Sequence, residues 1–129
     1  MGKTISIVNE KGGCAKTTTA YSLAQGLFMV GYKVLGVDMD SQGNFSTTWG
    51  SDPDCIGIYD VLAKNEPVRD AIQVKPDRFD LISGDKLLRD FAARTSYDTN
   101  FMLHDVLAEV EDEYDFIIID TPPTVATLT

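Results

Sequence analysis

The chain has few of the residues that build metal cages or disulfide frameworks, and it has no long apolar run. Its 129 residues include 2 cysteines and 1 histidine. Cys14 and Cys55 lack the paired spacing of a zinc site, so we expect reduced thiols and a cytoplasmic protein. No segment is apolar over the length of a transmembrane helix, and no signal-peptide pattern is present. We therefore expect no membrane span.

Basic residues are also scarce. The chain has 11 Lys and Arg against 20 Asp and Glu, which gives a net charge of −9. A chain of this charge repels a phosphate backbone, so we do not expect this segment to bind nucleic acid alone. The length suits one domain at most, with a single core, and the 43% hydrophobic fraction is typical of a globular protein. No repeat or linker divides it.

The most informative segment is KGGCAKTT, which starts at Lys11 and follows an apolar, β-branched run at residues 4–8. Glycines allow a sharp turn that directs several N–H groups at one anion. Lys16 supplies charge for the outer phosphates of a nucleotide, and the Thr17 hydroxyl suits Mg²⁺. The residues expected around the phosphates are Lys11, Gly12, Gly13, Cys14, Ala15, Lys16, Thr17 and Thr18.

Two residues depart from an ordinary phosphate loop. Lys11 is an additional lysine at the start of the loop, and Ala15 stands where glycine usually precedes the lysine. If position 15 required a positive φ, alanine would cost on the order of 1 kcal/mol in backbone strain. Such strain would weaken nucleotide affinity without abolishing it.

Three acids follow predicted strands. Asp38 and Asp40 come after the apolar run at residues 33–37, and Asp120 ends the run FIII. The carboxyl ends of strands form the edge where open α/β sheets bind ligands. Carboxylates near a triphosphate indicate Mg²⁺ or a positioned water. The alternative is that each acid is a solvated strand end.

The alternation of strand-like and helix-like segments predicts an α/β fold. We expect a three-layer, doubly wound, mostly parallel sheet of about five strands with right-handed crossovers. The strands are expected near residues 4–8, 33–37, 72–74, 79–82 and 114–120. The helices are expected after Lys16 and near 58–63, 87–91 and 102–110, with a helical turn at 68–71. One edge of this sheet should lack a neighbour.

Three motifs now fall in a familiar order: KGGCAKTT, VDMDSQGN and FIIIDTPP. With them the chain resembles the ParA/MinD group of deviant Walker A ATPases, most closely the ParA-type (Soj-like) partition ATPases. The resemblance covers essentially all 129 residues. It implies a P-loop NTPase-like fold, with residues 1–129 as the N-terminal portion of a single nucleotide-binding domain that is truncated at its C-terminus. The departures are Ala15 for glycine and Ser41 for proline.

The resemblance implies how the nucleotide and its metal are held. Lys16 would bind the β- and γ-phosphates of ATP, and Thr17 would ligate Mg²⁺. Asp38 matches the acid near the metal, and Asp120 matches the acid that holds a metal-bound water.

It also implies the catalytic groups. Lys11 matches the signature lysine, which reaches across a dimer interface to the partner's nucleotide. Asp40 matches the acid that positions or activates the attacking water. Together with Lys16, these residues form the implied catalytic set.

The implied function is partition of a plasmid or chromosome, with Mg-ATP driving homodimerisation and slow hydrolysis releasing the dimer. A centromere-binding ParB-like protein would be the partner. Non-specific DNA would bind through a region absent from this chain, which makes the full-length protein nucleoid-associated. Two alternatives stay open: a nucleotide-gated interaction module with little turnover, and a MinD-like membrane-surface ATPase, which needs a C-terminal amphipathic helix.

Overall fold

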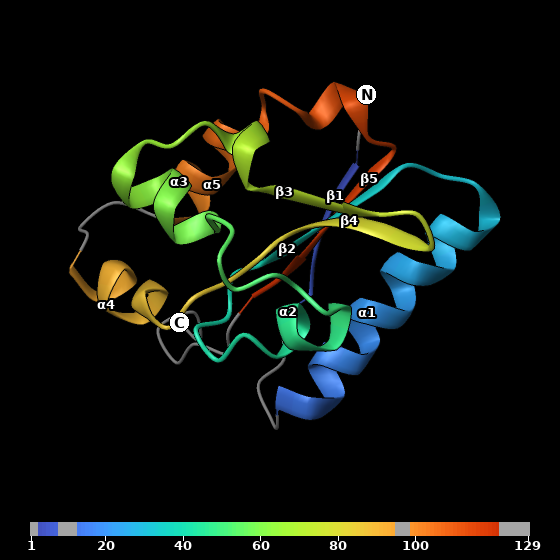
Figure 1. The fold of residues 1–129 in the computed structure, drawn as a ribbon, viewed down its shortest axis with the longest axis horizontal. Helices are drawn as coiled ribbons and strands as arrows, with labels where there is room; N and C mark the ends of the chain where they lie inside the picture. Colours follow the sequence, from blue (N-terminus) through green and yellow to red (C-terminus); the bar gives the residue numbers. More distant parts are fainter. Residues whose placement is uncertain (1–2, 8–12, 95–98, 122–129) are drawn as a thin grey trace.

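A computed structural model describes residues 3–7, 13–94 and 99–121, and shows a sheet with helices on both faces (Figure 1). The strands are β1 (Lys3–Ile7), β2 (Val34–Asp38), β3 (Ile72–Lys75), β4 (Arg78–Ile82) and β5 (Phe116–Asp120). The α-helices are α1 (Gly13–Val30), α2 (Asn44–Trp49), α3 (Ile58–Lys64), α4 (Leu87–Arg94) and α5 (Thr99–Leu107). Two 3-10 turns are η1 (Val68–Ala71) and η2 (Glu111–Glu113). All five predicted strands are present within about two residues of their expected bounds.

The sheet is mostly parallel, as predicted. Its strand order is β1-β5-β2-β4-β3, and the neighbours among β1, β5, β2 and β4 pair in parallel. β3 is the exception because it runs antiparallel to β4. Only Pro76 and Asp77 separate these two strands, and a two-residue connection can form a hairpin but not a crossover.

Each face of the sheet carries its own core, which gives the predicted three layers. On one face α1 and α2 pack their buried Ala20, Ala24, Phe45 and Trp49 against the sheet. On the other face α3, α4 and α5 cover the alternate residues of the same strands. The alternation is visible in β5, where Ile118 belongs to the first core and its neighbours belong to the second.

The predicted helix after Lys16 is present as α1, but it begins earlier, at Gly13, and ends at Val30. The residues from Gly13 to Lys16, which were expected in the loop, are therefore helical. Gly31 follows with φ of 117°, a left-handed conformation that suits glycine and ends the helix. The short helix α2 was not predicted. It is held in place by the buried Trp49, whose Nε1 donates to the carbonyl of Phe79 at 2.7 Å.

Candidate functional site

The three predicted acids lie together at the carboxyl edge of the parallel strands. Asp38 of β2 is the register partner of Asp120 of β5, which in turn pairs with Ile7 of β1. Adjacent strands are about 4.8 Å apart, so the two acids are close neighbours on one face of the sheet. The exposed fraction is 0% for Asp38, 5% for Asp40 and 0% for Asp120. They are therefore buried and are not solvated strand ends.

The glycine- and lysine-containing segment leads into α1 at the same edge. Lys11 and Gly12 lie outside the described residues, while Gly13 to Thr18 form the first turns of α1. Only residues 8–12 separate the end of β1 from the start of this helix. The helix start therefore lies close to the carboxyl edge, where its free N–H groups and its dipole favour an anion.

Ala15 lies inside α1, and a right-handed helix has a negative φ. The strain considered for alanine at this position therefore does not arise. The replacement of glycine by Ala15 leaves the backbone of the helix start intact.

Asp38 uses both of its carboxylate oxygens within the protein. The backbone N–H and the hydroxyl of Ser46 donate to Oδ2, at 2.9 and 2.6 Å. The backbone N–H of Asp40 donates to Oδ1 at 3.0 Å. Burial raises the pKa of Asp38 above its ordinary value, and the hydrogen bonds from Ser46 oppose that rise.

Asp40 opens a tight turn. Its Oδ1 accepts from the N–H of Gln42 and its carbonyl accepts from the N–H of Gly43, both at 3.0 Å. Gly43 has φ of 70°, which a residue with a side chain rarely adopts. The turn therefore fixes the direction in which the chain leaves β2 for α2.

Two residues in this network were not predicted from the sequence. Ser46 contacts Asp38, and Gly84, 38 residues further on, donates its N–H to the Ser46 hydroxyl at 2.9 Å. A Cβ on Gly84 would lie 2.7 Å from the carbonyl oxygen of Asp38. No sequence signal links these positions, because they meet only when β2 and β4 pair.

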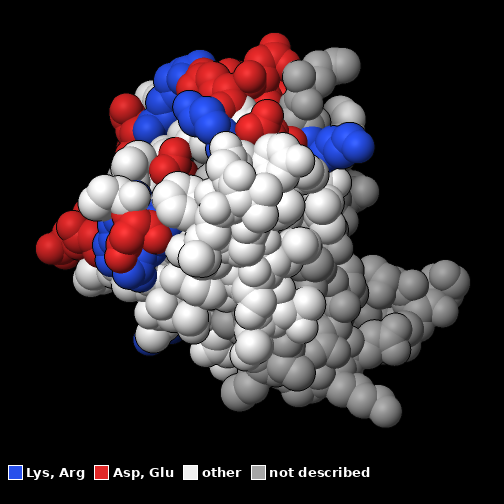
Figure 2. All heavy atoms as spheres, turned by 90° about the vertical axis from the view of Figure 1, so that its right-hand side faces the viewer, with Lys and Arg blue, Asp and Glu red and all other residues white. Residues whose placement is uncertain are grey.

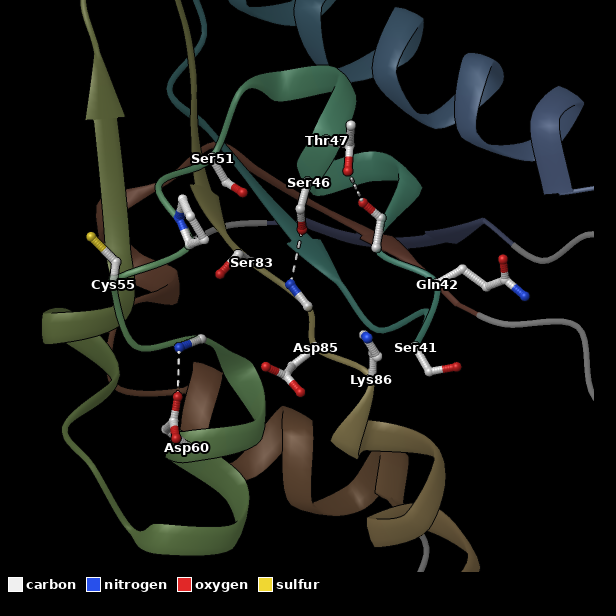
Figure 3. Close-up of a pocket in the computed structure, with 14 residues that line it drawn as sticks. Ser41, Gln42, Ser46, Thr47, Ser51, Cys55, Asp60, Ser83, Asp85 and Lys86 are labelled. Carbon is white, nitrogen blue, oxygen red and sulfur yellow. Dashed lines mark hydrogen bonds between the residues drawn. The ribbon is translucent and has the colours of Figure 1, made fainter.

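A hollow of ≈ 240 Å³ lies beside these residues, at the ends of β2 and β4 (Figure 3). The residues that line it include Ser41, Ser51, Ser83 and Lys86. In Figure 3 these side chains come from the loops after β2 and β4 and from the segment before α3.

Within the part of the chain that the structure describes, no three His, Cys, Asp or Glu residues are placed to hold a metal ion by themselves. None of the described helices is long and apolar enough to cross a membrane.

A parallel sheet whose first strand leads into a helix, with buried acids at the ends of the neighbouring strands, defines the class of P-loop-type α/β domains. Comparison with known proteins agrees with this class. The family model described as "AAA domain" matches residues 2–129. The chain belongs to the AAA domain family and matches the N-terminal half of its ParA-type (Soj-like) partition ATPases.

Among the relatives, the chromosome-partitioning ATPase Soj of Treponema pallidum is 40% identical over the whole chain and 52% of its own length. The structure of cobyrinic acid a,c-diamide synthase from Mycobacterium smegmatis, with bound ADP and magnesium, has a TM-score of 0.86 at 30% identity, covering 96% of this chain and 52% of that one. A plasmid partition protein from Borrelia burgdorferi has a TM-score of 0.82 at 30% identity, covering 96% and 57%. The chain thus spans about half the length of the relatives it matches.

Proposed function

We propose that the chain is the nucleotide-binding part of a partition ATPase, in which Mg-ATP drives the association of two copies and hydrolysis releases them. The main support is the site itself: three buried acids lie at one sheet edge, close to the start of an 18-residue helix. A cation stabilises buried carboxylates of like charge, and a helix start favours an anion. A magnesium nucleotide meets both needs.

The donor set fits Mg²⁺. This ion takes oxygen ligands and is commonly held by one or two protein groups together with substrate phosphates. We assign Thr17 and Asp120 to the ion and its water shell. Asp38, whose two oxygens already accept from Ser46 and Asp40, takes part through a water. When bound, the ion supplies positive charge to the phosphate oxygens.

The chain's own residues then have distinct tasks. Lys16 and the backbone N–H groups at the start of α1, within the segment Gly12 to Thr18, bind the phosphates. Lys11 reaches the nucleotide of the second copy. Asp40 holds the attacking water and accepts its proton. Positioning and charge supply most of the acceleration in phosphoryl transfer, so a buried, hydrogen-bonded acid suits this task.

The partners follow from the relatives and are proposals for the whole protein. They are a second copy of the chain, a centromere-binding ParB-like protein, and non-specific DNA bound outside residues 1–129. The net charge of −9 agrees with placing the DNA-binding surface elsewhere. The working location would be the cytoplasm, on the nucleoid.

Three variants test the proposal. Lys16→Ala should weaken Mg-ATP binding at least tenfold by calorimetry. Lys11→Ala should still bind ATP but should lose the additional association that Mg-ATP drives, measured by light scattering with and without nucleotide. Asp40→Ala should bind and dimerise, with phosphate release reduced by about 100-fold or more. Lys64→Ala, an exposed change on α3, is the control and should match the parent.

The wild-type results distinguish an active ATPase from a nucleotide-gated interaction module. Tight binding without phosphate release, even with the partner and DNA added, would favour a nucleotide-gated interaction module. Absence of Mg-ATP binding would overturn the proposal.

A further inference from the structure

Ser46 joins three segments of the site through one buried side chain. It lies in α2 and is only 4% exposed. Its hydroxyl donates to Asp38 at the end of β2 and accepts from the N–H of Gly84 in the loop after β4. The dashed line from Ser46 in Figure 3 marks this second bond. The hydroxyl therefore fills both of its roles, as donor and as acceptor.

The same network reaches Asp40. Ser46 fixes Oδ2 of Asp38, and the other oxygen of that carboxylate accepts from the backbone N–H of Asp40. The Asp38 carboxylate therefore cannot rotate without breaking the bond that holds Asp40. Ser46 and Asp40 are thus joined through one intermediate group, the Asp38 carboxylate.

The loop after β4 presses directly on both acids. A Cβ on Gly84 would lie 2.7 Å from the carbonyl oxygen of Asp38 and 3.1 Å from that of Asp40. Any side chain at this position would therefore displace the loop or the backbone of the two acids. Ser46 adds the hydrogen bond that holds the loop in this position.

We infer that Ser46 is a positioning residue for ATP hydrolysis: it fixes Asp38, and through it Asp40, against the loop that follows β4. The inference rests on the proposed function. Ser46 itself need not touch nucleotide or metal. Its removal should disturb the acid that holds the attacking water more than it disturbs the binding of ATP. Misplacement of a catalytic group by about 1 Å can reduce a rate by about 100-fold.

The first test is amide hydrogen exchange in the nucleotide-free 129-residue chain. Ser46→Ala should speed exchange at Asp40 and Gly84 at least tenfold relative to the core amide of Ile118. Ser46→Thr, which keeps the hydroxyl, should restore slow exchange. Thr48→Ala, an exposed change in the same helix, should have no effect.

The second test separates binding from turnover. Ser46→Ala should leave the Kd for Mg-ATP within about threefold and lower kcat by about 10- to 100-fold, with recovery in Ser46→Thr. If Ser46→Ala does not fold, Ser46→Cys replaces it, because cysteine has a similar shape and its thiol is a weak donor. Its kcat should fall in the same way, but by a smaller factor.

The outcomes distinguish the two proposals. An unchanged kcat in Ser46→Ala, in a chain that hydrolyses ATP, overturns the inference. If the wild type does not hydrolyse ATP, the proposed function fails, and hydrogen exchange still decides whether Ser46 fixes Asp40. Unchanged exchange at Asp40 in Ser46→Ala overturns the link between Ser46 and Asp40. An equal increase at Asp40 and Ile118 also overturns it, because that result reports only a general loss of stability.

Discussion

Gly36 lies in β2 where two aromatic rings leave no space for a side chain. A Cβ at this position would lie 2.7 Å from the ring of Phe79 and 2.9 Å from the ring of Phe45. These rings stack with their centroids 5.8 Å apart. The absence of a side chain at Gly36 therefore lets α2 pack closely on the sheet and keeps Ser46 beside Asp38.

Gly36→Ala should lower the free energy of unfolding by about 1–3 kcal/mol, because the new methyl group forces the rings apart. Urea denaturation measures the change. Gly26→Ala is the matched control, since Gly26 lies in α1 with nothing within 4 Å of its added Cβ. That substitution should stabilise the chain by about 0.5–1 kcal/mol. Equal effects at the two positions would contradict the packing argument.

Tyr114 provides a prediction about alkaline pH. Its hydroxyl donates to Asp80 Oδ2 at 2.7 Å, and burial raises the pKa of Tyr114 far above its ordinary value. The unfolded chain loses this proton above about pH 10, whereas the folded chain keeps it. The contribution of Tyr114 to stability is therefore complete below pH 10 and declines as the pH rises above it.

Urea denaturation between neutral and alkaline pH tests this sign. Above about pH 10 the wild type should lose stability more steeply than Tyr114→Phe, since only the wild type can ionise this residue on unfolding. At neutral pH the variant should be less stable by about 1–2 kcal/mol, because Asp80 loses a donor. The other tyrosines of the chain are common to both proteins. Parallel curves would show that Tyr114 does not carry the effect.

At the scale of elements, the β3–β4 hairpin supports α2 at its C-terminal end. Lys75 Nζ donates to the carbonyl of Gly50 at 2.8 Å and lies 4.6 Å from the centre of the Trp49 ring. Arg78 donates to the carbonyl of Trp49 at 2.8 Å. These cations satisfy carbonyls at the end of α2, which have no partner within the helix itself. The hairpin thus holds the helix that carries Ser46.

Lys75→Met should therefore destabilise the fold by about 1–2 kcal/mol, by removing a hydrogen bond and a cation–π contact. Lys64→Met is the matched control because Lys64 also lies near an aromatic ring and an acid, but its side chain is 60% exposed. Its effect should stay within about 0.5 kcal/mol. Thermal and urea unfolding of the two variants give the comparison. Similar losses in both would contradict a special role for Lys75.

The contrast between α1 and α2 shows how far the sequence could predict this fold. The body of α1 has regular apolar spacing and is followed by Gly31, so local pattern was enough to predict this helix, although not its start at Gly13. The segment of α2, NFSTTW, contains residues of poor helix propensity, and it forms a helix because Trp49, Lys75 and Arg78 meet there in the tertiary structure.

The same reasoning applies to the site. The placement of Asp38, Asp40 and Asp120 could be predicted because Asp38 and Asp120 end apolar strands, Asp40 follows two residues later, and parallel strands bring their ends to one edge. Ser46 and Gly84 join the hydrogen-bond network of the site only because β2 pairs with β4 and α2 lies beside them. Neither the order of the strands nor a helix of six residues can be read from local periodicity.

At the scale of the whole molecule, charge is unevenly distributed. Residues 17–32, which include most of α1, contain no Lys, Arg, Asp or Glu. Figure 2 shows the corresponding face as mostly uncharged, with charged side chains gathered at the top and upper left. Met29 and Val30 are each 75% exposed on this helix. Two chains of net charge −9 repel each other least when they approach through this uncharged surface. A sheet edge beside it would therefore be the favoured place for contact.

Such an edge is provided by β1, which among the described residues pairs only with β5. The N–H of Lys3 donates to the carbonyl of Asp115 at 2.9 Å, so by the alternation of a parallel ladder the N–H of Thr4 faces the other side. A free strand edge can pair with a second chain.

Without nucleotide, we expect self-association by sedimentation velocity and a melting temperature that rises with protein concentration. Thr4→Pro should abolish both effects with little loss in the monomer, whereas Lys3→Pro should destabilise the monomer by removing the bond to β5. A cooperative melt at high temperature that does not depend on concentration would contradict pairing at this edge.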